Sequence, residues 1–368
     1  MGEETIKKRL IKDVEELRDP KGFIRAGSPR FNTLYGRDSL ITAWQLLDYD
    51  AGIAKNTLKI LAELQGQKRD FLSEEEPGKI IHETWPVGQL PEGDWPVPYY
   101  ASVDVTPLFV ILAGKYFEKT EDEDFIKSIW PNIKKAKDWI LTFGDENQDG
   151  FLDYRQKNPR GLFHHGWKDS NFDKTWPPPI AIVEVQGYKY EALSHFQKLS
   201  GENIEGLENF KEKFLNSFFW PEENFFYLAL DGQGVRYQIL ASNPGHLLFT
   251  NLIEMPYKKL IVQRLFQNDF WTEYGLRTHS TANVNFNPYG YHLGAVWPFD
   301  NWLIARGLKI SGFDKEYEMV KQALLKTYRI LGHLPELYGV TLDGEIKSLG
   351  RANSLQAWSS AGLLNMLQ

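Results

Sequence analysis

Apolar residues recur at helical spacing along almost the whole chain, and this periodicity limits the possible folds more than any other feature. In the first segment Ile6, Leu10 and Val14 are each four residues apart, which places them on one face of a helix. The pattern predicts helices over residues 5–19, 37–49, 52–66, 102–118, 123–143, 179–200, 204–217, 243–252, 257–268, 294–311, 314–330 and 354–367. Strand signals are short and lie beside DG turns, at 225–231 and 339–346, and they predict local hairpins.

The connections between these helices differ sharply in length. Some have two residues, such as 50–51 and 312–313, whereas others are long and rich in Pro, Gly and Trp. The long ones are 67–101, 144–178, 269–293 and 331–353. A ring of helical hairpins would give this alternation, with the long loops gathered at one end. We therefore predict an all-α fold, an (α/α)6 barrel (six-hairpin toroid) with minor β-hairpins, built as a single domain from residues 1–368.

Composition and charge exclude several classes of protein. There is no cysteine, so disulfides, thiolate nucleophiles and thiolate metal sites are ruled out. The net charge of −7, with acids and bases interspersed, argues against a nucleic-acid partner. No apolar run approaches the roughly 18 residues of a membrane span. The N-terminal segment is charged and lacks the apolar core of a signal peptide, so we expect a cytoplasmic protein without a membrane partner.

Aromatic residues are frequent, with 12 Trp, 17 Tyr and 23 Phe. Most of them are expected in the core. However, many Trp and Tyr residues lie beside Pro, Gly, Asp and His in irregular segments such as ETWPVG, GDWPVPYY, HHGWKDS, KTWPPP and AVWPFD. Sugars suit such segments, because a sugar ring stacks on an aromatic face while its hydroxyls reach carboxylates and amides. The partner we expect is a small-molecule or oligosaccharide substrate.

Two acidic residues are candidates for acid–base chemistry. Asp169 lies in GWKDS, and an acid beside the indole of Trp167 is partly desolvated, which raises its pKa and suits a general acid. The alternative is that Asp169 caps a turn. Glu336 follows Pro335 in LPELYG, and its alternative is an ordinary solvated glutamate. Three other glutamates compete for the second role: Glu83, Glu273 and Glu345.

Arg37 and Asp38 open a helix after Gly36. An acid is favoured in the first turn of a helix, so the pair could be structural. A carboxylate also accepts hydrogen bonds on both oxygens, so Asp38, oriented by Arg37, could hold two neighbouring sugar hydroxyls.

Metal and cofactor motifs are weak or missing. No zinc-type spacing appears among the eight histidines, and no GxGxxG, Walker or GxSxG motif is present. DENQDG at 145–150 resembles the start of a calcium loop, but the twelfth position is Gln156 where a bidentate Glu belongs. We favour a turn, and we predict neither a metal nor a cofactor.

Taken in order, these segments resemble the amylo-α-1,6-glucosidase (glycogen-debranching) group of glycoside hydrolases. The most specific matches are GRDSLIT, GWKDS and YHLGAVWPFDN, and the resemblance extends over most of the chain from residue 31. It implies an (α/α)6 barrel and an inverting hydrolysis by two carboxylates without a metal. It implies Asp169 as general acid, Glu336 as general base, and Arg37 with Asp38 as the pair that grips the terminal glucose. The further substrate contacts that we predict are Trp85, Tyr100, Asp104, Trp167, Lys168, His292, Trp297, Gln356 and Trp358.

The chain departs from this group beside the proposed acid. His164 and His165 replace a frequent Asn-Gln, and NFDKTW is an unusual continuation after WKDS. The linkage and the aglycone therefore stay open. The sequence predicts an exo-acting hydrolase that releases glucose from α-glucosides or α-glucan oligosaccharides, linked α-1,6 or α-1,4. Alternatives are a hydrolase of a small α-glycoside such as glucosylglycerate, mannosylglycerate or trehalose, a phosphorylase or histidine-dependent epimerase on the same barrel, and an inactive carbohydrate-binding barrel.

Overall fold

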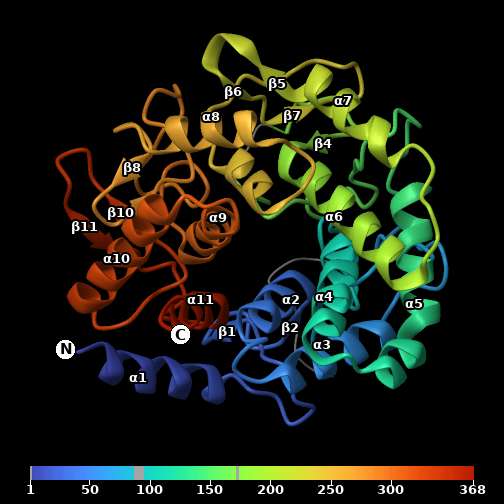
Figure 1. The fold of residues 1–368 in the computed structure, drawn as a ribbon, viewed down its shortest axis with the longest axis horizontal. Coiled ribbons are helices and arrows are strands. Elements are labelled where there is room, and N and C mark those ends of the chain that lie inside the picture. Colours follow the sequence, from blue (N-terminus) through green and yellow to red (C-terminus); the bar gives the residue numbers. More distant parts are fainter. Residues whose placement is uncertain (1, 87–94, 171–173) are drawn as a thin grey trace.

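The computed structural model describes residues 2–86, 95–170 and 174–368, and over these ranges eleven of the predicted helices are α-helices (Figure 1). The first long loop and the unusual NFDKTW segment are thus only partly described, because residues 87–94 and 171–173 lie outside these ranges. The helices are α1 (Glu3–Glu16), α2 (Gly36–Gln45), α3 (Ala51–Glu63), α4 (Val105–Thr120), α5 (Glu123–Leu141), α6 (Val183–Ser200), α7 (Leu207–Phe218), α8 (Met255–Leu265), α9 (Pro298–Ile310), α10 (Asp314–Leu331) and α11 (Ala357–Met366).

The helix predicted at 243–252 was wrong in type. This segment is a 3-10 helix, η2 (Asn243–Phe249), and a shorter one, η1, spans Pro221–Glu223. Every residue of η2 is buried. Its His246 is fixed from both sides, since Tyr188 lies 2.6 Å from Nδ1 and Asp300 lies 2.8 Å from Nε2. Pro244 at the start and these two side-chain bonds explain a short, tightly wound element in place of a longer α-helix.

Six helices contact one another in a closed order around the molecule. α2 contacts α4, α4 contacts α6, α6 contacts η2, η2 contacts α9, α9 contacts α11, and α11 returns to α2. The remaining helices pack outside this ring: α1 on α11, α3 on α2 and α4, α5 on α4 and α6, α7 on α6, α8 on η2, and α10 on α9 and α11. Figure 1 shows the same arrangement, with the outer helices at the rim. The fold is an all-α toroid.

Burial distinguishes the inner helices from the outer ones. All ten residues of α2 are buried, including Arg37 and Asp38. α5, in contrast, is amphipathic, and its buried residues fall at the spacing of one helical face, from Phe125 to Ile140. The carboxylate of Asp122 caps α5 by accepting from the backbone N–H of Phe125 at 3.1 Å. A helix of the inner ring has neighbours on every side, so it loses the polar face that marks a surface helix.

Short antiparallel strands tie the loops together. The pairs are β1 (Gly27–Ser28) with β12 (Leu355–Gln356), β2 (Leu34–Tyr35) with β3 (Glu83–Thr84), β4 (Ala181–Ile182) with β7 (Ala229–Leu230), β5 (Phe219–Trp220) with β6 (Phe225–Phe226), β8 (Trp271–Thr272) with β9 (Gly275–Leu276), and β10 (Tyr338–Val340) with β11 (Ile346–Ser348). The hairpin predicted at 339–346 is confirmed by β10 and β11. In the segment 225–231, β6 and β7 pair with β5 and β4 instead of with each other.

The pair of β1 and β12 joins distant parts of the chain, because Gly27 is opposite Gln356. The strands β2 and β12 lead directly into α2 and α11, so they set where these inner helices begin. Within the described residues, no helix has the length and apolar character that crossing a membrane requires.

Candidate active site

A cavity of about 410 Å³, partly open to solvent, lies where three inner helices begin. Arg37 and Asp38 are in the first turn of α2, Trp297 is the N-cap residue of α9, and Gln356 is the N-cap residue of α11. The lining residues are Phe31, Tyr35, Arg37, Asp38, His82, Trp167, Asp169, Tyr291, His292, Trp297, Glu336, Gln356 and Trp358.

The cavity brings together most of the residues singled out from the sequence. Asp169 and Glu336, which are 167 positions apart in the chain, line the same space, and Arg37 and Asp38 line it with them. The other predicted contacts found there are Trp167, His292, Trp297, Gln356 and Trp358.

Four predicted substrate contacts do not line the cavity. Tyr100 is buried and donates its hydroxyl to the carbonyl of Leu64 at 2.9 Å. Trp85 donates its indole N–H to Glu83 at 2.8 Å. Asp104 lies behind Arg37 as its partner.

Lys168 is the fourth of these residues, and its ammonium lies 4.8 Å from the ring centroid of Trp167. Its ammonium donates to the carbonyl of Thr278 at 2.5 Å and to the hydroxyl of Ser242 at 3.2 Å.

The guanidinium of Arg37 is held in a fixed orientation. Its Nε and Nη2 donate to the two oxygens of Asp104 at 2.8 and 3.0 Å, and the hydroxyl of Ser102 supports Asp104 at 2.8 Å. Burial opposes the charge on Arg37, but the contact with Asp104 outweighs it, and the pKa of Arg37 is raised. The remaining nitrogen, Nη1, lies 4.0 Å from Oδ2 of Asp169.

Asp169 has the properties expected of a general acid. Its side chain is 26% exposed, so it can reach a ligand in the cavity. Burial is the largest effect that raises its pKa to about 7, Asp104 and Glu336 add to the rise, and Arg37 opposes it. A carboxyl group with such a pKa holds a proton near neutral pH.

Glu336 has the opposite environment. Its two oxygens accept hydrogen bonds, one from the hydroxyl of Tyr291 and the other from the backbone N–H of Asn353 at 2.9 Å. The side chain is buried, and its own backbone N–H donates to the carbonyl of Asn353 at 2.9 Å. Both oxygens of Glu336 are therefore held by fixed donors.

A chain of hydrogen bonds connects Asp38 to Glu336. The amide of Gln356 donates to Oδ1 of Asp38 at 3.0 Å, and the amide of Asn353 donates to Gln356 at 3.0 Å. Asn353 is the residue whose backbone holds Glu336. Burial raises the pKa of Asp38 to about 8, Arg37 lowers it, and the neighbouring Glu336 and Asp169 raise it further.

The raised pKa of Asp38 predicts a pH-dependent effect on stability. The unfolded chain releases this proton near pH 4, whereas the folded protein holds it up to about pH 8. The free energy by which Asp38 destabilises the folded state therefore grows as the pH rises through this interval, and it is constant above it. We expect Asp38→Asn to raise Tm by a few degrees more at pH 9 than at pH 5, measured by thermal melts. The exposed Asp48→Asn is the control, and a gain that shrinks with rising pH would contradict the assignment.

The competing glutamates differ in their surroundings. The side chains of Glu273 and Glu345 are 79% and 62% exposed and pair with Lys326 and Lys347, and neither residue lines the cavity. Glu83 is buried, but its oxygens accept from the indoles of Trp85 at 2.8 Å and Trp95 at 2.5 Å.

The aromatic rings that line the cavity form an aromatic wall, which consists of Phe31, Tyr35, His82, Trp167, Tyr291, His292, Trp297 and Trp358. Four of these residues were not selected from the sequence: Phe31, Tyr35, His82 and Tyr291. Three of them lie at the start of segments singled out from the sequence: Tyr35 precedes GRDSLIT, His82 precedes ETWPVG, and Tyr291 opens YHLGAVWPFDN. Trp297 stacks on His292 at 5.1 Å between ring centroids, and Phe299 stacks on Trp358 at 4.0 Å. Burial lowers the pKa of His82 to about 3 and that of His292 well below its usual range, so both imidazoles are neutral.

The histidines of the epimerase alternative do not gather in this cavity. His164 and His165 point to opposite sides, as expected of neighbours in an extended segment: His164 lies beside Lys168 and Glu184 in one cavity, and His165 lies in another. Among the residues that the structure describes, His292 is the only one of the histidines considered for an epimerase that lines the cavity together with Asp169 and Glu336.

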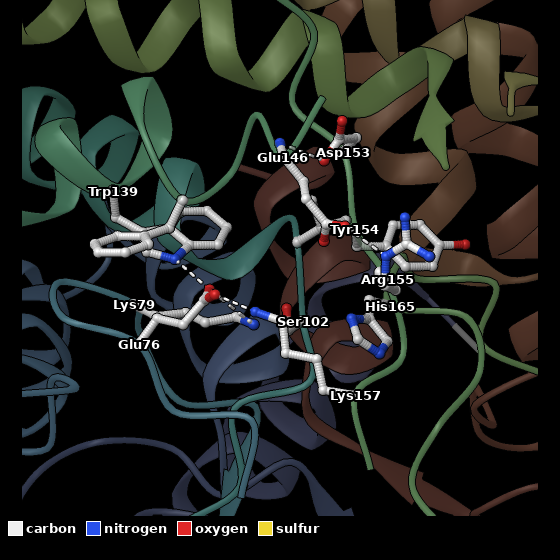
Figure 2. Close-up of a pocket in the computed structure, with 12 residues that line it drawn as sticks. Glu76, Lys79, Ser102, Trp139, Glu146, Asp153, Tyr154, Arg155, Lys157 and His165 are labelled. Atoms are coloured by element: carbon white, nitrogen blue, oxygen red, sulfur yellow. Dashed lines mark hydrogen bonds and ion pairs between the residues drawn. The ribbon is translucent and has the colours of Figure 1, made fainter. Parts of the chain in front are cut away.

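The cavity that contains His165 has about 280 Å³ and is lined by charged groups that pair with each other (Figure 2). Glu76 accepts from the indole of Trp139 at 2.9 Å and from Lys157, and Lys79 lies 3.7 Å from it. On the far side Arg155 pairs with Glu146 at 2.5 Å. None of the predicted catalytic residues lines this cavity.

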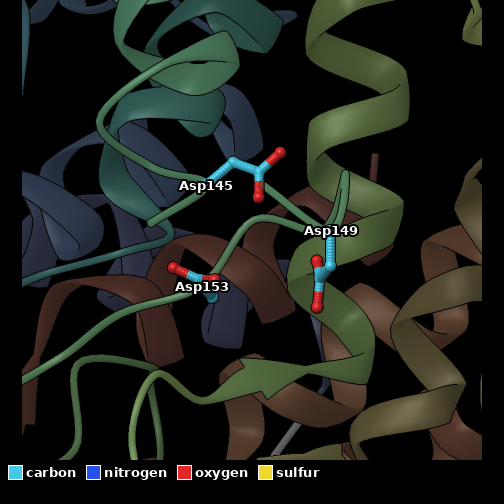
Figure 3. A group of neighbouring side chains, drawn as sticks. All are labelled: Asp145, Asp149 and Asp153. Atoms are coloured by element: carbon cyan, nitrogen blue, oxygen red, sulfur yellow. The ribbon is translucent and has the colours of Figure 1, made fainter. Parts of the chain in front are cut away.

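The turn that resembles a calcium loop brings Asp145, Asp149 and Asp153 together, each with an oxygen within 4.8 Å of the others (Figure 3). Backbone N–H groups of the same turn occupy one oxygen of each: Gly150 donates to Asp145, Phe151 to Asp149 and Glu146 to Asp153. The amide of Gln156 donates to the carbonyl of Gly161. The turn expected from the sequence is present, its three carboxylates lie close enough together to hold a cation, and the expectation that it binds no metal stays a prediction.

Comparison with known proteins points to sugar chemistry. Residues 198–336 match the family model for the mannosylglycerate hydrolase MGH1-like glycoside hydrolase domain. This part of the chain resembles a glycoside hydrolase. A mannosylglycerate hydrolase of Rubrobacter radiotolerans is 22% identical over 158 residues, which is 42% of this chain. The match spans about a third (34%) of the length of that curated relative. The family match ends at Glu336 and does not include Asp169.

Solved structures show the same fold over the full length. The GH63 mannosylglycerate hydrolase of Thermus thermophilus in complex with glucose has a TM-score of 0.75 and 15% identity, over 99% of this chain and 100% of that one. The complex of the same enzyme with Tris and D-glycerate has a TM-score of 0.72 and 14% identity, over 98% and 99%. Within the glycoside hydrolases, these matches name mannosylglycerate hydrolases and not the amylo-α-1,6-glucosidases that the motifs resemble.

Proposed function

We propose that this chain is an inverting glycoside hydrolase of the (α/α)6-barrel type, acting on a small α-glycoside whose aglycone is glycerate. Mannosylglycerate and glucosylglycerate are the substrates of first choice. The observation that carries the proposal is one cavity lined by Asp169 and Glu336 together with Arg37 and Asp38. The similarity of residues 198–336 to an MGH1-like domain supports the class of substrate.

The two carboxyl groups divide the chemistry between them. Asp169 donates its proton to the glycosidic oxygen as the bond from that oxygen to the anomeric carbon breaks, and glycerate leaves with the proton. Glu336 takes a proton from a water molecule, whose oxygen bonds to the opposite face of the anomeric carbon. Inversion needs space for this water, so we expect the two carboxyl groups to lie roughly 6.5–9.5 Å apart. Exchange with solvent then returns a proton to Asp169 and removes one from Glu336.

The rest of the cavity binds the sugar. Asp38 and Arg37 hold the hydroxyls at the closed end, and the aromatic wall around Trp297 and Trp358 stacks on the ring. Asp38 carries a proton near neutral pH and can donate as well as accept, which suits hydroxyls that do both.

A substrate screen tests this proposal. The glycosides are mannosylglycerate, glucosylglycerate, trehalose, maltose, isomaltose, panose and limit dextrin, and the readout is released monosaccharide. We expect the glycerate glycosides to have the highest kcat/KM. If isomaltose, panose or limit dextrin is the best substrate, the oligosaccharide function suggested by the motifs replaces this one.

The first sugar released reports the stereochemistry. Because water attacks the face opposite the leaving group, an α-glycoside is expected to yield the β-anomer, which 1H NMR detects before mutarotation. Release of the α-anomer would instead indicate retention and a covalent intermediate on a carboxylate.

A further inference from the structure

Two arginines lie against the aromatic wall of the cavity, on its solvent side. The guanidinium carbon of Arg351 is 5.3 Å from the ring centroid of Tyr291, and that of Arg30 is 5.6 Å from the ring centroid of Phe31. Both rings line the cavity, whereas both arginines are exposed. The arginines therefore mark its mouth.

Both arginines are positioned by backbone groups. Arg351 donates to the carbonyl of Tyr289, and Arg30 donates to the carbonyl of Arg351 at 2.8 Å. The main chain of Arg30 is bound to Asn353, which accepts from its N–H at 3.0 Å and donates to its C=O at 2.6 Å. The backbone N–H of Asn353 also donates to Glu336, so one residue positions both the mouth of the cavity and the proposed base.

The backbone beside Arg30 is strained. Phe31 has a φ of +59°, a left-handed conformation that a bulky residue rarely adopts. In this conformation the ring of Phe31 lines the cavity, and the guanidinium of Arg30 lies against that ring. Strain of this kind is concentrated at binding and catalytic sites.

Charge decides where an anionic group can bind. Inside the cavity the cation is Arg37, and Asp104 occupies two of its nitrogens. Of the three other carboxyl groups that line this space, Asp38 and Asp169 hold a proton near neutral pH, so the negative charge there is that of Glu336, the proposed base. Arg351, in contrast, forms no ion pair with any carboxylate in residues 2–86, 95–170 or 174–368. A carboxylate ligand is therefore repelled from the interior and attracted to the mouth.

We propose that Arg351 binds the carboxylate of the aglycone and thereby selects acidic aglycones over neutral ones, an inference that rests on the proposed function. A planar guanidinium donates two parallel hydrogen bonds to a carboxylate, which a neutral alcohol cannot match. Stacking on Tyr291 limits the orientations of Arg351, and the hydroxyl of Tyr291 reaches Glu336. The residue thus links recognition of the leaving group to the place where water is activated.

The test uses two substrates that differ in one group. Glucosylglycerate and glucosylglycerol carry the same sugar, and the second has a hydroxymethyl group where the first has a carboxylate. We expect Arg351→Ala to raise KM for glucosylglycerate about 10- to 100-fold, with kcat nearly unchanged, because charged hydrogen bonds to the aglycone are lost. Glucosylglycerol should be unaffected. Arg351→Lys should retain part of the preference, and Arg329→Ala, a substitution of an exposed arginine on α10, is the matched control.

A binding measurement separates this inference from the proposed function. Calorimetric titration with D-glycerate alone needs no turnover, and we expect wild type to bind it and Arg351→Ala to bind at least about tenfold more weakly. Equal binding by both proteins, or an equal rise of KM for both glycosides, would overturn the role of Arg351. If D-glycerate binds through Arg351 but neither glycoside is hydrolysed, the recognition role stands and the proposed reaction is wrong.

Discussion

We expect the Glu336→Gln variant to lose hydrolysis of every glycoside, whatever its leaving group. Glutamine keeps the shape, but its single oxygen can accept from only one of the two donors, Tyr291 or Asn353, and it cannot take a proton from water. Loss of a general base lowers kcat by about 10²- to 10⁴-fold. The measurement is kcat for glucosylglycerate and for an activated substrate such as an α-glycosyl fluoride, and both should fall together.

The control for this variant is Glu345→Gln, since Glu345 is an exposed glutamate paired with Lys347 at 2.6 Å. It should retain full activity. If Glu336→Gln remains active, another residue is the base, and Glu83 is the next candidate because it is buried close to the cavity residue His82.

The Asp169→Asn variant should separate substrates by their leaving groups. Glycerate leaves poorly without a proton, so kcat for glucosylglycerate is expected to fall about 10²- to 10⁴-fold. Fluoride needs no proton to leave, so an α-glycosyl fluoride should be hydrolysed at close to the wild-type rate. In wild type the activity on glucosylglycerate should decline as the pH rises through about 7, where Asp169 loses its proton.

A half-buried carboxyl group outside the cavity provides the control. Asp13 on α1 accepts from Ser360 at 3.1 Å, and burial raises its pKa as well, but it lies outside the cavity. Asp13→Asn should leave both substrates and the pH profile unchanged. Equal losses on both substrates in Asp169→Asn would instead assign Asp169 a role in binding.

The sequence predicted the helices better than their environments. The periodicity of α5 is visible in the sequence because one face of this helix is exposed to solvent. The helix begins and ends close to the predicted residues. The inner helices lack a polar face, so their starts were placed three or four residues too early in α4, α6 and α9. For α9 the reason is chemical, because Pro298 is favoured at the first helical position. The 3-10 form of η2 depends on bonds from His246 to Tyr188 and Asp300, which only the tertiary structure supplies.

Residue types were easier to assign to the site than side-chain directions. The motifs led to Asp169 and Glu336, but no local pattern shows that Tyr291 turns its hydroxyl to Glu336. Phe31 lines the cavity with its backbone in a left-handed conformation, and the local sequence does not predict that conformation. Lys168 was also selected from the sequence, but its ammonium donates to Ser242 and Thr278 and does not line the cavity.

The pairing of β1 with β12 has a consequence for how this protein acquires activity. It places Gly27 against Gln356, and Gln356 in turn binds Asp38, a partner 318 positions earlier. The proposed sugar-binding pair, acid and base lie at residues 37–38, 169 and 336, so no local stretch of chain contains all of them. Closure of so long a loop is a late event in folding. We therefore expect that the proposed activity appears only after the ring has closed.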